Sequence, residues 1–192
     1  MTTKELIDIA TKITMENIEN VQSSVSSLTN EQLTWRPAAG SWNITEVLAH
    51  LNSYGTYYNP VFLRKIENTR FTSTKEAFIS SQLGKSAWKS MKLGNAKNIK
   101  RKFKSQKGAN PSIDNSLITG SEVQSFLDSQ NEFLHVFEKA QNVNIRRVKI
   151  PISISKIVRL RLGDALLFVV YHNQRHIQQV LNIINHPNFP QQ

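Results

Sequence analysis

Four stretches of the sequence repeat apolar residues at intervals of three and four, and this spacing constrains the fold more than any other feature. Each stretch is long enough for several helical turns: residues 3–28, 43–69, 119–142 and 162–185. An apolar residue at every third or fourth position lines one face of an α-helix, and that face is buried against other helices. The sequence therefore predicts an all-α fold in which these segments form a four-helix bundle.

The connection between the second and third predicted helices is much longer than a turn. Residues 70–117 are rich in Ser, Lys, Gly and Asn, although a short helix near 74–92 fits the sequence. A segment of this length has to cross the domain. We expect a long crossover that reaches a helix other than the nearest neighbour, within a single domain of residues 1–192. Residues 143–163, rich in β-branched side chains, are expected to form a loop before the last helix.

Composition limits the chemistry that the chain can perform. The sequence has no cysteine, which excludes disulfides, thiolate metal ligands and a cysteine nucleophile. No apolar run is long enough to cross a membrane, and no signal peptide is evident, so we expect a cytoplasmic protein. The net charge is +10, and residues 85–107 hold nine Lys or Arg and no acid. Because no nucleic-acid recognition motif accompanies that run, we interpret it as a solvated loop.

Two histidines, His172 and His176, stand four positions apart in the last predicted helix. Positions i and i+4 lie on the same face of a helix, so both rings can approach one point. His50 lies near the apolar stripe of the second predicted helix and can join them if the two helices are neighbours. Three imidazoles plus one water form an open site typical of a catalytic divalent metal, chiefly zinc. The alternative interpretation is hydrogen-bonded core histidines without metal.

Other polar residues near these positions allow two interpretations each. Glu46 completes a capping box with Asn43, or it orients a metal ligand. Arg175 binds an anionic substrate, or it pairs on the surface. Gln179 is a candidate for hydrogen bonding at the site, and Tyr54 either lines the pocket or packs in the core. A di-iron carboxylate site is excluded because the chain offers one Glu-x-x-His motif and that chemistry needs two, with two further glutamates.

Two motifs of the chain resemble the DinB superfamily. These are SWNITEVLAHL at residues 41–51 and LRLGDALLFVVYHNQRHIQQV at residues 160–180, with PSID and FLDSQNEFL between them also similar to members. The resemblance implies a four-helix bundle with its long link between the second and third helices. It also implies a metal held by His50, His172 and His176. Members with known activity resemble transferases and isomerases in which a low-molecular-weight thiol binds the metal.

The expected function is therefore that of a metal-dependent enzyme with a thiol-dependent, S-transferase-like activity. The metal is expected to be zinc or nickel, and the partners a small-molecule substrate and a small thiol, with no specific nucleic acid and no membrane. A homodimer is a further expectation. Two alternatives remain open at this point: a metal-dependent hydrolase, and a non-catalytic module that binds a metal or a ligand.

Overall fold

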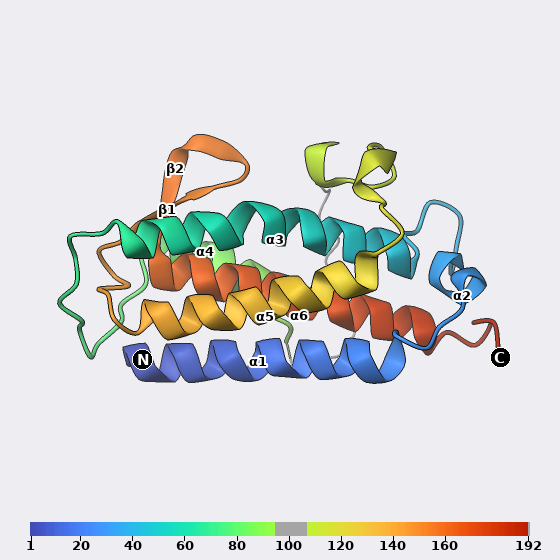
Figure 1. Cartoon of the computed structure of the whole chain (residues 1–192), viewed down its shortest axis with the longest axis horizontal. Coiled ribbons are helices and arrows are strands. Elements are labelled where there is room, and N and C mark those ends of the chain that lie inside the picture. Colours follow the sequence, from blue (N-terminus) through green and yellow to red (C-terminus); the bar gives the residue numbers. More distant parts are fainter. Residues whose placement is uncertain (95–106, 192) are drawn as a thin grey trace.

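The computed structural model describes residues 1–94 and 107–191 and is mainly helical, as predicted (Figure 1). The helices are α1 (Thr3–Ser24), α2 (Asn30–Thr34), α3 (Ile44–Glu67), α4 (Gln82–Met91), α5 (Glu122–Ala140) and α6 (Leu162–Ile184), with 3₁₀ turns η1 (Lys107–Ala109) and η2 (Asn115–Leu117). Two strands, β1 (Lys149–Ile152) and β2 (Ser155–Arg161), complete the elements. Among the residues described, no helix is long and apolar enough to span a membrane.

The start of α3 is fixed by a capping box, as the sequence indicated. The Asn43 side chain accepts a hydrogen bond from the backbone N–H of Glu46 (2.8 Å), and the Glu46 carboxylate accepts one from the backbone N–H of Asn43 (3.0 Å). Two backbone donors that have no partner within the helix are thereby satisfied. The box sets where α3 begins and hence which face His50, one turn further on, presents.

Helices α3 and α5 are parallel neighbours. The Asn52 side chain donates to the backbone carbonyl of Glu122, and Asn59 donates to that of Ser129. Residue numbers thus rise together along both helices, as they also do where Phe62 stacks on Phe133. The expectation that the crossover reaches a more distant helix is therefore wrong. The connection is long because parallel neighbours require the chain to return along the full length of α3.

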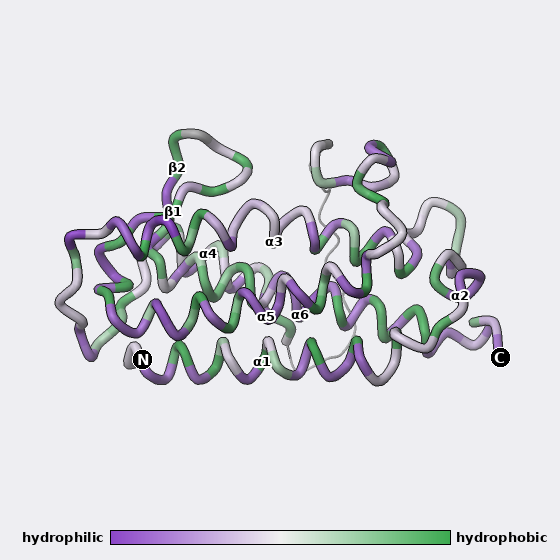
Figure 2. Tube along the Cα trace, viewed as in Figure 1, coloured by the Kyte–Doolittle hydropathy of each residue, from purple (hydrophilic) through white to green (hydrophobic). Residues whose placement is uncertain are grey.

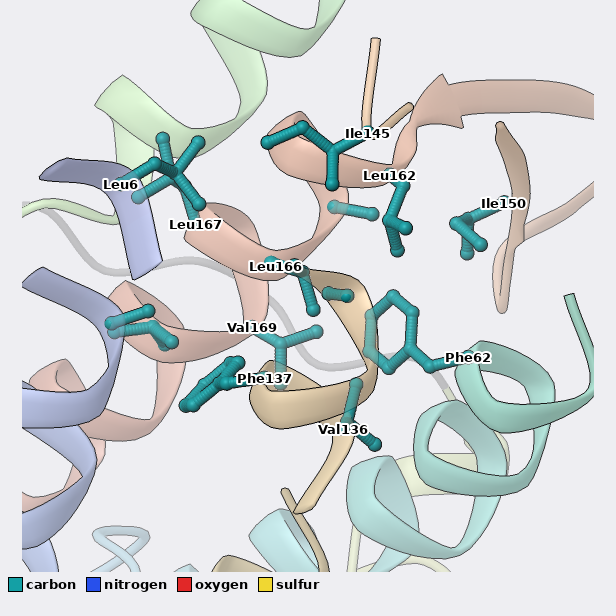
Figure 3. Packing of buried hydrophobic residues seen from close by; sticks show 14 of the residues in the cluster. Leu6, Phe62, Val136, Phe137, Ile145, Ile150, Leu162, Leu166, Leu167 and Val169 are labelled. Atoms are coloured by element: carbon teal, nitrogen blue, oxygen red, sulfur yellow. The ribbon is translucent and has the colours of Figure 1, made fainter. Parts of the chain in front are cut away.

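The buried apolar residues form two clusters rather than one. The larger cluster joins the start of α1, the end of α3, the end of α5 and the start of α6, and Figure 3 shows Phe62, Val136 and Leu166 meeting in it. The smaller cluster lies toward the opposite end of the same four helices. Along the long helices in Figure 2, hydrophobic and hydrophilic residues alternate as expected for helices with one buried face.

Buried polar residues occupy the helices between the two clusters. We call them the polar layer: Thr14, Asn17, His50, Gln130, His172 and Asn173. Each is less than 5% exposed. The Asn173 side chain donates to Gln130 Oε1 (3.2 Å), which links α6 to α5. Buried polar groups cost free energy unless they find partners, so a layer of six in the middle of the core indicates a function other than packing.

The 70–117 segment is partly packed into the core, because Phe78 and Trp88 are buried in the larger cluster. Helix α4 lies against α6. Its N-cap, Ser81, donates through its backbone N–H (3.0 Å) and its hydroxyl (2.9 Å) to the carboxylate of Asp164, which is fully buried. Of the basic run at 85–107, residues 95–106 lie outside the described part of the chain.

Residues 149–161, expected to be part of a loop, form an antiparallel hairpin instead. Strand β1 pairs with β2, with Ile150 opposite Leu160, and both of these side chains are buried. The β-branched residues that suggested a loop favour extended backbone, so this expectation was wrong for a reason contained in the composition itself. Between its strands the hairpin places Ser153 beside α3, where the Ser153 N–H donates to the Tyr58 hydroxyl (3.2 Å).

We predict that Gly84→Ala destabilises the protein, because a Cβ at this position would overlap the carboxylate of Asp164. Overpacking of this kind typically costs about 1–3 kcal/mol. Urea denaturation of the variant measures the loss. Gly94→Ala is the matched control, since a Cβ there meets no atom within 4 Å. An equal stability of the two variants would show that α4 is not held against Asp164.

Candidate metal centre

The three histidines singled out in the sequence lie together: His50 and His172 belong to the polar layer, and His176 lies next to it. His50 comes from α3, and His172 and His176 come from consecutive turns of α6. One ring nitrogen from each lies within 4.8 Å of the others, and the Nε2 atoms of His50 and His172 are 3.2 Å apart. His50 and His172 are buried, whereas His176 is partly exposed. The i, i+4 spacing thus brings two rings together, and the packing of α3 against α6 adds the third.

These residues fit a divalent metal in donor type and spacing. Two nitrogens bound to one tetrahedral zinc at about 2.0–2.1 Å are roughly 3.3 Å apart, close to the separation of the two Nε2 atoms. Imidazole nitrogen is a good ligand for zinc, nickel, copper and iron. In the part of the chain that the structure describes, no other His, Cys, Asp or Glu joins the group.

Hydrogen bonds orient two of the three rings toward a shared point. His50 Nδ1 donates to the backbone carbonyl of Ala109 (2.5 Å), and His176 Nδ1 donates to Oε1 of Gln179 (3.0 Å). Since both partners are acceptors, the hydrogen of each neutral ring is on Nδ1 and the lone pair is on Nε2. Such partners are typical of metal-binding histidines, because they fix the tautomer and the ring orientation. Gln179 thus hydrogen-bonds to the ring of His176.

The surroundings favour neutral imidazoles. Burial lowers the pKa of His172 well below its ordinary value of 6.5, and repulsion from a charged His176 or His50 lowers it further. Burial also lowers the pKa of His176, to about 3, with repulsion from His50 adding to the effect. The pKa of His50 is lowered by burial as well. Neutral rings are the form that binds a metal, so the cluster is ready for one at neutral pH.

Aromatic side chains enclose the three rings. Tyr54 stacks on His172 with ring centroids 4.1 Å apart and planes at 20°. The ring centroid of Trp42 lies 5.0 Å from that of His50 and 6.2 Å from that of His176. Burial, assisted by the neighbouring Tyr58, raises the pKa of Tyr54 to about 12, so its hydroxyl keeps its proton at neutral pH. The enclosure restricts ring movement and keeps the dielectric low around the cluster.

The other sequence candidates take different positions. Glu46 forms the capping box, and its carboxylate also accepts two hydrogen bonds from the Arg36 guanidinium (2.6 and 2.7 Å). Arg175 is buried, and its positive charge contributes to lowering the pKa of His172 and His176, which places it close to them. Sequence reasoning missed Arg36 and Ala109. No side-chain pattern could have indicated Ala109, because its contribution is a backbone carbonyl.

The remaining histidines and the rejected di-iron motif lie elsewhere. His135 is exposed and contacts Glu138 (3.2 Å), while Glu132 accepts a hydrogen bond from Asn59. His186 follows the end of α6, where its ring packs on Trp35 at 5.2 Å. All three residues are therefore engaged away from the His50–His172–His176 cluster, as the rejection of a di-iron site requires.

We predict that the protein without metal loses stability in mild acid. The histidine pKa values are lowered in the folded state. Below pH 6.5 the histidines of the unfolded chain therefore bind protons, whereas the buried rings of the folded chain stay neutral. Above pH 6.5 the histidines do not lower the free energy of unfolding. As the pH falls from 6.5 toward the folded-state pKa values, that free energy decreases. Thermal unfolding between about pH 7.5 and pH 5 measures the loss. His172→Gln should reduce it and His135→Gln should not; equal slopes in both variants would contradict the prediction.

Comparison with known proteins identifies the family. A family model described as the DinB superfamily matches residues 15–180, which include all three histidines and both sequence motifs. Comparison with curated proteins and with solved structures gave no match. Because the matched region spans most of the 192 residues, the chain belongs to the DinB superfamily.

Proposed function

We propose that the protein is a metal-dependent enzyme that activates a low-molecular-weight thiol for transfer to an electrophilic small molecule. The observation that supports this most is the ligand set: three neutral imidazoles, with no further ionisable ligand among the described residues. A structural zinc site normally has four protein ligands, whereas a catalytic one has three and leaves a position for water or substrate. The ligand set therefore favours catalysis over a purely structural metal.

A divalent metal bound here supplies a Lewis acid that lowers the pKa of a coordinated thiol or water. The chain has no cysteine, so any thiol must come with the substrate. Three neutral ligands leave the full positive charge of the metal in place, and the low dielectric of the aromatic enclosure strengthens its attraction for a thiolate. These two properties stabilise an activated anion at the metal, which in this proposal is the thiolate.

The residues around the cluster have distinct roles in this proposal. Arg175 carries a permanent positive charge close to His172 and His176, and it binds a carboxylate of the thiol or of the acceptor. Tyr54 stays protonated and donates a hydrogen bond to a substrate oxygen. Trp42 closes the side next to His50 and His176 and limits access of water. The chain thus binds and orients its substrates, and in this proposal the nucleophile is the thiol.

The same proposal extends to the architecture and the native metal. We infer that α1, α3, α5 and α6 form a four-helix bundle and that residues 1–192 form a single domain. Their mutual contacts support this inference, since α3 packs on α5 and α6, and α1 packs on the same two helices. The imidazole ligands fit zinc or nickel.

We predict about one divalent ion per chain in protein purified without an affinity tag. His172→Ala should abolish stoichiometric metal, because it removes one of the three nitrogens and the partner of His50 Nε2. His135→Ala, which changes an exposed histidine on α5, should leave the metal content unchanged. Elemental analysis of the three proteins is the measurement. Full occupancy in His172→Ala would exclude this metal site.

The thiol can be tested separately on cobalt-substituted protein. We predict that excess thiol adds a charge-transfer band to the cobalt spectrum, because a thiolate–metal bond is formed. Arg175→Gln should weaken the response to a thiol that bears carboxylates and leave the response to 2-mercaptoethanol unchanged. A spectrum that no thiol alters, while the cobalt stays bound, would contradict thiol activation and favour the hydrolase.

A further inference from the structure

Residues 107–117, which we call the strap, lie along α3 beside the metal centre (Figure 1). In the described part of the chain, hydrogen bonds from Ala109 and Ser112 attach the strap to α3. The backbone carbonyl of Ala109 accepts from His50 Nδ1 (2.5 Å), and the hydroxyl of Ser112 donates to Oε1 of Glu46 (3.2 Å). His50 and Glu46 are one helical turn apart, so the two attachments act on the same face of α3.

Hydrogen bonds within the strap connect its two attachments. The carbonyl of Asn110 accepts from the backbone N–H groups of Ile113 and Asp114, both at 2.9 Å. The Asn110 side chain accepts from the N–H of Ser112 (3.1 Å). These bonds close a turn over residues 110–114, directly after Ala109. Movement of Ser112 away from Glu46 would therefore carry Ala109 with it.

Glu46 is a fixed anchor for the strap. It is 3% exposed, and the guanidinium of Arg36 holds its carboxylate by two hydrogen bonds while also donating to the carbonyl of Ser41 (2.5 Å). Burial by itself would raise the pKa of Glu46, but the bonds from Arg36 and Asn43 outweigh it and the pKa lies below its ordinary value. The carboxylate is thus ionised and a strong acceptor for the Ser112 hydroxyl.

We propose that Glu46 and Ser112 are positioning residues that hold the strap so that the Ala109 carbonyl fixes the tautomer and orientation of His50. Their role is indirect. The Glu46 carboxylate binds the Ser112 hydroxyl, the turn connects Ser112 to Ala109, and the Ala109 carbonyl binds the His50 imidazole. Without the carbonyl, the hydrogen of His50 could occupy Nε2, and the ring would present no lone pair to the cluster. The proposal rests on the metal site proposed above and adds residues that control its affinity.

A matched pair of serine variants tests this inference. Ser112→Ala removes the bond to Glu46, whereas Ser116→Ala removes a hydroxyl of the same strap whose hydrogen bond among the described residues is to Asp114. We expect Ser112→Ala to weaken cobalt binding roughly tenfold or more, the range seen when an outer partner of a metal ligand is lost. Ser116→Ala should leave the affinity unchanged, and Ser112→Thr should restore it. Competition with a chelator measures the dissociation constants.

A second readout separates positioning from a general effect on folding. Nitrogen-15 NMR of the metal-free protein reports the His50 tautomer, which should be the Nδ1–H form in wild type and Ser116→Ala and a mixture in Ser112→Ala. The inference would be overturned if both alanine variants kept the cobalt affinity and the His50 tautomer of wild type. It would also be overturned if both variants lost the same amount of cobalt affinity. If wild type bound no metal, the proposed function would fail, while the tautomer would still decide the role of the strap.

Discussion

The histidine cluster depends on keeping three uncharged imidazoles close together inside a helical protein. Two charged rings at the 3.2 Å separation of His50 and His172 would repel each other strongly in a low dielectric. The protein meets this need by burial, which disfavours the charged form, and by apolar clusters on both sides of the polar layer. The clusters supply the cohesion that the polar layer lacks, and they fix the spacing of α3 and α6 at the level of the rings.

The parallel pairing of α3 with α5 and the construction of the site are connected. Parallel neighbours need a long return segment, and part of that return supplies Ala109 and Ser112 beside the metal centre. Another part forms α4, which covers α6 and is held by Asp164. At the other end of α5, the hairpin brings Ser153 to Tyr58, one turn from Tyr54. Both connections flanking α5 therefore contact the same face of α3 that carries His50.

Much of this arrangement is predictable from the sequence, because helix periodicity and i, i+4 spacing are local properties. The long helices, the Asn43 capping box and the approach of His172 to His176 all depend on residues within one helix. The parts that were missed depend on contacts between distant segments. The carbonyl of Ala109 carries no side-chain signature, and the burial of Phe78 arises because Gly163 leaves room for its ring. The hairpin was misread as a loop, although its β-branched residues favour extended backbone, because the pairing of β1 with β2 joins residues that are not neighbours in the sequence.

The distance in sequence between the two halves of the metal centre affects how a cell can assemble it. His50 and His172 are separated by 122 positions, and the ribosome delivers the chain from its N-terminus. Before α6 is synthesised, α1, α3 and α5 contain only His50 of the three histidines. Their polar residues then lack the helix against which they pack. A metal ion present then meets only a single ligand. A three-histidine metal site, as proposed above, can therefore form only after α6 has been synthesised.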